Sequence, residues 1–129
     1  MTGGELLIDE DAGAELGSTM RRGLIAVGGH VGAFAGVSVI AGTLFLFGSV
    51  GPRCGVGMKR GSIVAYQPIP SIGTYAYDCE YEPLYPQLVL RHLRQLNFPI
   101  PDAAWSPGYR RYSGDRLTIG KGEILLHNA

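Results

Sequence analysis

The side chains best able to bind a metal or activate a nucleophile are few and scattered along the chain. They are the histidines His30, His92 and His127 and the cysteines Cys54 and Cys79. Their spacing matches no known metal site, and no serine lies in a nucleophile elbow. We expect two reduced, partly buried thiols and an exposed His30 in a turn. These residue types therefore assign no catalytic and no metal-binding role to this chain.

Two other clusters have a weaker claim on a ligand. The run Asp9, Glu10 and Asp11 offers oxygen ligands for calcium, but the calcium-binding β-roll is built on a nonapeptide repeat that is absent here. The stretch GVGMKRG (55–61) has one residue too many for a phosphate-binding GxGxxG loop. Lys plus Arg and Asp plus Glu number 11 each, so no overall field attracts nucleic acid. We expect a solvated acidic turn and no nucleic-acid partner.

Residues 23–51 contain no Asp, Glu, Lys or Arg and are numerous enough to cross a membrane as a helix. Glycine and β-branched residues make this stretch a poor helix, however, and its glycine spacing continues outside it. The first residues, MTGGELLIDEDAG, lack the basic and apolar segments of a secretory signal. We therefore expect a cytoplasmic protein without a membrane span.

Glycine recurs every 19 residues. Written in lines of that length from Gly4, the first four lines begin GELLID, GLIAVG, GTLFLF and GSIVAY. Three glycine columns result: Gly4, Gly23, Gly42 and Gly61; Gly13, Gly32 and Gly51; Gly17, Gly36 and Gly55. Because glycine permits the positive φ angles of sharp corners, we expect these columns to be structural corners of a repeating unit.

Apolar residues alternate with period two inside each line, which is typical of strands. Two columns are expected to point inward: Leu6, Ile25, Leu44 and Ile63, and then Ile8, Val27, Leu46 and Ala65. We expect short strands at 25–27, 44–46 and 63–65, with a second strand near 37–40. Identical lines stacked in register predict a mainly β fold, a right-handed parallel β-helix with 19-residue coils.

The repeat ends after residue 74, and a helix is predicted over 83–96. One face of that helix holds Tyr85, Leu88, Val89, Leu93 and Leu96. An extended tail and a closing strand in KGEILLHNA follow. We expect a single domain in which residues 1–74 form coils and residues 75–129 form a helix and tail packed on them. The outward column Leu7, Ala26, Phe45 and Val64 is too apolar for water and needs this cover.

The first coil is expected to leave one edge of the stack open. Exposed strand edges pair readily with other chains. The candidate partner interface is therefore Glu5, Leu6, Leu7 and Ile8, together with Phe45 of the outward column. Another protein or a second copy of the chain would satisfy this edge.

The stretch GSTMRRGLIAVGGHVG (17–32) and its echo GVGMKRGSIVAY (55–66) resemble the GxGxG β-helix. That fold is shared by the C-terminal domain of glutamate synthase and by the C-type subunit of formylmethanofuran dehydrogenase. The stretches IAGTLFLFGSVGPRCGVGMKRGSIV, YDCEYEP and RRYSGDRLTIGKGEILL are similar to the version of this C-type subunit found in the formyltransferase/hydrolase complex of methylotrophic bacteria. The resemblance covers about residues 4–127. Family members are usually longer, with more coils before the region that matches Gly4.

The resemblance implies a non-catalytic scaffold subunit in one-carbon metabolism. Such complexes move a formyl group from tetrahydromethanopterin through a methanofuran-type carrier and release formate, or interconvert it with CO2. Pterin-bound metal or zinc belongs to the partner proteins, which are amidohydrolase-like, formyltransferase-like or dehydrogenase-B-like. No catalytic, cofactor or metal residue carries over to this chain.

Two other interpretations remain open. One is a stand-alone β-helical binding module that forms a homo-oligomer through its open end. The other is a relative of the glutamate synthase GxGxG domain, although nothing here resembles the flavin or glutaminase regions of that enzyme.

Overall fold

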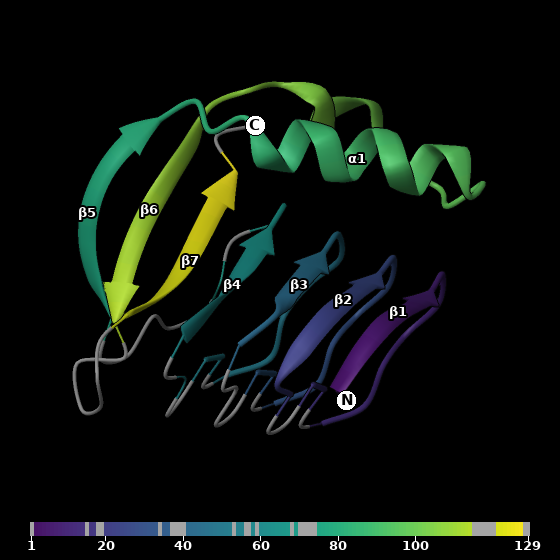
Figure 1. Cartoon of the computed structure of the whole chain (residues 1–129), viewed down its shortest axis with the longest axis horizontal. Helices are drawn as coiled ribbons and strands as arrows, with labels where there is room; N and C mark the ends of the chain where they lie inside the picture. The colour runs from purple at the N-terminus through teal and green to yellow at the C-terminus, as the bar shows by residue number, and fades with distance from the viewer. Residues whose placement is uncertain are drawn as a thin grey trace.

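The computed structural model of the chain describes residues 2–14, 16–17, 20–33, 35–36, 41–52, 54–55, 58, 60–67, 69, 75–114 and 121–127 (Figure 1). Those residues form seven strands, one α-helix and one 3-10 helix. The elements are β1 (Thr2–Ile8), β2 (Arg22–Val27), β3 (Thr43–Leu46), β4 (Arg60–Ala65), β5 (Ala76–Tyr81), α1 (Tyr85–Gln95), η1 (Asp102–Trp105), β6 (Tyr109–Gly114) and β7 (Lys121–His127).

Strands β1 to β4 pair in parallel, each with the strand of the next repeat. The pairs Leu6 with Ile25, Ile25 with Leu44 and Leu44 with Ile63 all keep the 19-residue register. Across the core from these strands, Ala12, Val31 and Val50 form parallel bridges with the same spacing. The predicted register is therefore confirmed in this part of the chain.

The sheet as a whole is mixed, in the order β1-β2-β3-β4-β7-β6-β5. Strand β7 pairs in parallel with β4, while β6 pairs antiparallel with both β7 and β5 (Figure 1). The expectation of a right-handed parallel β-helix is therefore wrong for this fold. Once the repeat ends, β6 and β7 follow one another directly, and strands joined by a short connection pair antiparallel. The second strand expected near 37–40 lies outside the described residues.

The C-terminal part contains more regular structure than expected. The predicted helix is confirmed at Tyr85–Gln95, and the closing strand is confirmed as β7. The segment expected to be an extended tail includes η1 and β6. Among the described residues, no helix is long and apolar enough to cross a membrane.

The inward columns line one apolar cluster on one face of the sheet. Ile25, Leu44 and Ile63 are at most 2% exposed there, and Ile124 of β7 extends the same cluster. Met20 and Met58 fill it without any exposed surface. A methionine adapts to irregular gaps, which suits these buried positions in the cluster.

Helix α1 covers the opposite face, running from the β7 side of the sheet toward β1 (Figure 1). Ala26, Phe45 and Val64 of the outward column pack there with Leu90 and Leu93 of the helix. All five are fully buried. The predicted need for a cover over this column is thus confirmed.

The buried face of α1 differs from the predicted one. Leu88 and Leu96 remain 51% and 45% exposed, whereas Leu90 is completely buried together with Leu93. Pro86, Leu90 and Leu93 are spaced three or four residues apart and so share one stripe. The periodicity of the sequence therefore predicted a helix correctly, but it assigned the exposed Leu88 and Leu96 to the buried face and left out Leu90.

The C-terminal end of α1 is fixed by a turn that brings Phe98 back onto the sheet. Asn97 has a φ of 62°, its N–H donates to Arg94 O, and Phe98 N–H donates to Leu93 O, each at 3.0 Å. This is the Schellman arrangement, in which asparagine tolerates the left-handed position. Phe98 then packs on Phe47 with ring centroids 5.7 Å apart.

Candidate partner interface

Strand β1 lies at one end of the sheet, so one of its edges faces no other described strand. Gly28 N–H donates to Ile8 O at 2.8 Å, which shows that Ile8 turns its main chain toward β2. Neighbouring residues of a strand direct their main-chain groups to opposite sides, so Leu7 N–H and C=O face the open edge. Leu6 is 44% exposed, whereas Ile25 in the same column is 2% exposed.

Four of the five predicted interface residues lie at this edge. Glu5 and Leu6 are exposed, and Leu7 and Ile8 are partly buried. Phe45 is fully buried beneath α1, so the structure does not bring it to the surface.

Two glutamates in one column of the sheet, Glu5 and Glu123, form hydrogen bonds with residues near the two ends of α1. Glu5 of β1 accepts a hydrogen bond from His92 Nε2 at 2.5 Å, with both side chains well exposed. Glu123 of β7 is more buried and accepts from Ser62 Oγ, Tyr85 OH and Arg111 Nε at 2.8, 3.0 and 2.8 Å. A carboxylate with three donors is well satisfied, so Glu123 anchors the start of the helix to the sheet.

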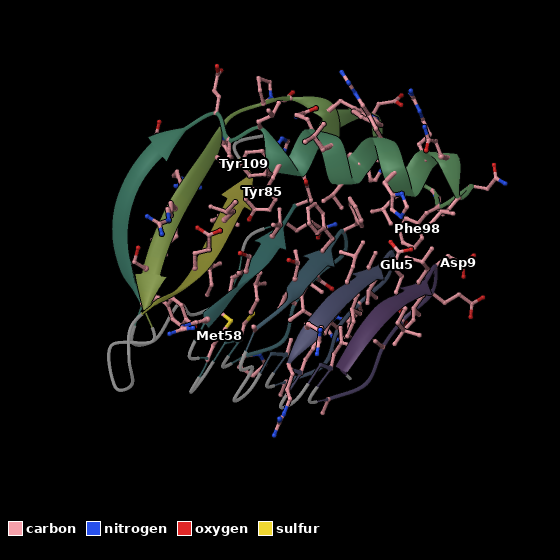
Figure 2. All side chains as sticks on the ribbon, viewed as in Figure 1. Glu5, Asp9, Met58, Tyr85, Phe98 and Tyr109 are labelled. Atoms are coloured by element: carbon pink, nitrogen blue, oxygen red, sulfur yellow. The ribbon has the colours of Figure 1, made fainter. Side chains whose placement is uncertain are left out.

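An open groove of about 200 Å³ adjoins the exposed edge where β1 ends. It is lined by Leu7 and Asp9 on one side and by residues 96–99 on the other. A second groove, of about 470 Å³, begins at Asp9 and Pro99 and continues along Phe47 and Ile100. Figure 2 shows Asp9 at the end of β1 beneath the C-terminal end of α1. The two grooves are thus lined by apolar and polar residues, and both include Asp9.

The predicted glycine columns occupy two kinds of position. The first and third columns have positive φ angles throughout: Gly4, Gly23, Gly42, Gly61, Gly17, Gly36 and Gly55. The second column does not, but a Cβ at Gly32 would lie 2.8 Å from Ala14 N, and one at Gly51 would lie 2.7 Å from the carbonyl carbon of Gly32. Gly13, at the open end, has nothing within 4 Å. Gly23 and Gly61 lie inside β2 and β4.

A second polar cluster is buried under the start of α1. The hydroxyls of Tyr66 and Tyr109 share a hydrogen bond of 2.7 Å, and both rings pack on His127. Burial raises the pKa of Tyr66, as does the neighbouring Tyr109, and burial also raises the pKa of Tyr109. His127 Nε2–H donates to Ser106 O at 2.7 Å, and its Nδ1 has no hydrogen-bond partner among the described residues. Both phenols therefore stay protonated at neutral pH and cannot act as bases there.

Of the remaining candidate ligands, the side chain of Cys79 lies outside the described part of the structure, and His30 and Cys54 lie apart from each other. His30 is exposed in a turn as predicted, where its N–H donates to Asp11 Oδ1 and its ring contacts Ser49 Oγ, each at 2.7 Å. Cys54 is a buried free thiol, and burial raises its pKa to about 12. No three histidine, cysteine or acidic side chains come together as a metal site within the described part of the chain.

Three features of the structure were missed in the sequence. The pairing of Glu5 with His92 and the role of Glu123 depend on where the helix lies, which no local pattern shows. A signal for Glu123 did exist, because GEILL at 122–126 repeats GELLI at 4–8. Apart from the acidic run Asp9, Glu10 and Asp11, nothing in the sequence indicated a groove beside Asp9.

Comparison with solved structures gives a match that covers nearly the whole chain. No protein-family model matches the chain, and neither does any curated protein. A chain in the crystal structure of the formyltransferase/hydrolase complex (FhcABCD) from Methylorubrum extorquens, in complex with methylofuran, has a TM-score of 0.82 and 34% identity. The alignment covers 97% of this protein and 46% of that chain. The protein thus shares fold and sequence with about half the length of that chain.

Proposed function

We propose that this protein is a non-catalytic scaffold protein of a formyltransferase/hydrolase complex in one-carbon metabolism, equivalent to the C-type subunit named above. The proposed complex moves a formyl group from tetrahydromethanopterin through a methanofuran-type carrier and releases formate. Its partners would be amidohydrolase-like, formyltransferase-like and dehydrogenase-B-like proteins in the cytoplasm.

The observation that carries this proposal is the similarity to one chain of the solved complex over 97% of this protein, at 34% identity. A fold by itself would not indicate a function, but identity of this level across nearly the whole chain supports a related role. The stretches that suggested the C-type subunit, including GVGMKRGSIV and GKGEILL, lie within residues 4–127.

The scaffold role is supported by the chemistry of the described side chains. The carboxylate of Glu123 is bonded to three donors, and the phenols of Tyr66 and Tyr109 have raised pKa values. Cys54 is buried with its thiol protonated. General acid–base catalysis needs an accessible group with a pKa near the working pH, and these groups do not provide one.

Co-purification tests the proposal directly. The tagged protein, isolated from its native cell at low ionic strength, should bring down an amidohydrolase-like and a formyltransferase-like protein. The assembly should release formate from formyl-tetrahydromethanopterin, and the tagged protein alone should not. As a matched control, Leu93→Asp should destroy the packing of α1 and abolish co-purification, whereas Leu88→Asp should keep the fold.

Two outcomes would contradict the proposal. Recovery of a discrete homo-oligomer with no other protein would favour a stand-alone binding module. The scaffold role would be ruled out if the other proteins assembled unchanged and released formate at the full rate without this chain.

A further inference from the structure

The open edge of β1 offers main-chain hydrogen-bond groups, and what can occupy it is restricted. Leu7 directs its N–H and C=O away from β2, and Leu6 lies beside them with 44% of its surface exposed. A strand added at such an edge gains main-chain hydrogen bonds and pockets for alternate side chains. The occupant is determined by shape and by charge.

Shape argues against another 19-residue repeat of the same kind. Gly29 and Gly48 fall in the column of Glu10. A Cβ at Gly29 would lie 2.7 Å from the carbonyl carbon of Glu10, and a Cβ at Gly48 would lie 2.5 Å from that of Gly29. In this column the Cβ position therefore points at the preceding repeat. Glu10 carries a Cβ and a carboxylate there, so a further repeat paired with β1 in the same register would collide with it.

Charge argues against a second copy of the chain. Residues 2–14 contain four carboxylates and no lysine or arginine. Glu5 is bonded to His92, and Asp11 accepts from His30 N–H. No hydrogen bond or ion pair engages the side chains of Asp9 and Glu10 within the described structure. Two such edges brought together would place like charges opposite each other.

The groove beside the edge points to one kind of side chain. It lies on the Leu7 face of β1 and is lined by the apolar residues Leu7, Leu96, Phe98 and Pro99 together with the polar residues Asp9 and Asn97. A lysine or arginine places its apolar stem against such apolar residues and its charge against the carboxylate. We propose that the β1 edge binds an extended, basic polypeptide segment as an added strand, with one lysine or arginine side chain in the Asp9 groove. This inference stands on the edge geometry and does not need the proposed complex.

Peptide binding to the full chain tests the proposal. The probe is a capped nine-residue peptide of alternating lysine and valine, and the charge control replaces each lysine by glutamate. A third peptide keeps the lysines but carries N-methyl groups on alternate amides, so that it cannot pair with a strand. We expect measurable binding of the lysine peptide, none of the glutamate peptide, and at least about tenfold weaker binding of the N-methylated one.

Two variants locate the binding site. Asp9→Asn should weaken binding of the lysine peptide several-fold, whereas Asp102→Asn, which changes an exposed carboxylate on η1, should leave it unchanged. Hydrogen exchange at the Leu7 amide should slow when the lysine peptide is added. Circular dichroism checks that both variants keep the fold.

Four results would overturn the proposal. Equal binding of the N-methylated peptide would mean charge attraction without strand addition. If the lysine peptide does not bind, the edge does not take a basic segment. If Asp9→Asn and Asp102→Asn have equal effects on binding, the bound side chain does not lie in the Asp9 groove. Protection of the Leu7 amide that rises with protein concentration, without any peptide, would make a second copy the occupant.

Discussion

At the scale of single residues, glycine serves two purposes in the stacked turns. Gly42 has a φ of 118°, and a Cβ there would lie 2.6 Å from Met20 Cε and 3.2 Å from Gly23 O. Gly51 has no positive φ but leaves room for the main chain of the preceding turn. A side chain is thus opposed by backbone strain in one column and by close approach of the backbone in another.

We predict that Gly42→Val lowers the free energy of unfolding by more than about 1 kcal/mol, because valine is strained at that φ and crowds Met20. Gly13→Ala is the matched control, since a Cβ there meets nothing within 4 Å and its φ is not positive. Its stability should stay within about 0.5 kcal/mol of the parent. Urea denaturation measures both, and equal midpoints for Gly42→Val and the parent would contradict the argument.

The buried thiol of Cys54 makes stability depend on alkaline pH. Burial raises its pKa from 9.0 to about 12. Below pH 9 the folded and unfolded chains both keep the thiol proton, so the burial of Cys54 does not lower the free energy of unfolding there. Above pH 9 the unfolded chain loses the proton first, and the free energy of unfolding falls as the pH rises toward 12.

We predict that Cys54→Ala makes this fall shallower between pH 9 and pH 11, by up to about 1.4 kcal/mol per pH unit. Tyr66→Phe should act in the same direction above pH 10, because burial raises the pKa of Tyr66 as well. Urea denaturation at a series of pH values measures the slopes. A slope for Cys54→Ala equal to that of the parent would mean that the thiol ionises in the folded protein as freely as in the unfolded chain.

At the scale of elements, α1 is held by packing along its length and by hydrogen bonds near its ends. Leu90 and Leu93 are fully buried against the outward column of the sheet. Tyr85 bonds Glu123 of β7, and His92 bonds Glu5 of β1. The helix thus spans the sheet from its centre to its open edge, so movement of the helix would alter the candidate interface.

Truncating Leu93 to alanine should cost about 2 to 5 kcal/mol of stability, because it opens a cavity between α1 and the sheet. Leu88→Ala changes the same residue type on the same helix at a side chain that is 51% exposed. It should cost less than about 0.5 kcal/mol. Thermal or urea unfolding of both variants is the measurement, and similar losses for the two would refute the assigned face.

At the scale of the whole molecule, we propose that the two parts of the sequence form one domain. Strand β7, from the C-terminal part, lies between β4 and β6, and its Ile124 and Leu125 join the two apolar clusters. The parallel strands β1 to β4 and the C-terminal segment therefore share both cores. Unfolding one part would expose apolar surface of the other.

This arrangement predicts one cooperative unfolding transition for the whole chain. Far-ultraviolet circular dichroism and tyrosine fluorescence should give the same midpoint, because the helix and the stacked strands lose structure together. The calorimetric and van't Hoff enthalpies should agree. Two separated transitions, with the helix signal lost first, would show that residues 75–129 fold as a separate unit.

The sequence by itself determined the 19-residue register, the strands after each glycine, the inward columns, the helix and the closing strand. These features follow from local periodicity, which Leu6, Ile25, Leu44 and Ile63 express without any gap. It also predicted that the outward column needs a cover, because a row of apolar side chains cannot face water.

Only the tertiary structure decided where the C-terminal segments go. The insertion of β7 beside β4, the antiparallel β5 and β6, and the burial of Phe45 depend on contacts between residues far apart in the chain. The buried face of α1 was set by the surface it meets, so Leu90 rather than Leu88 packs inward. Periodicity gives each element its inner and outer sides, but it contains no information on which distant element will pack against them.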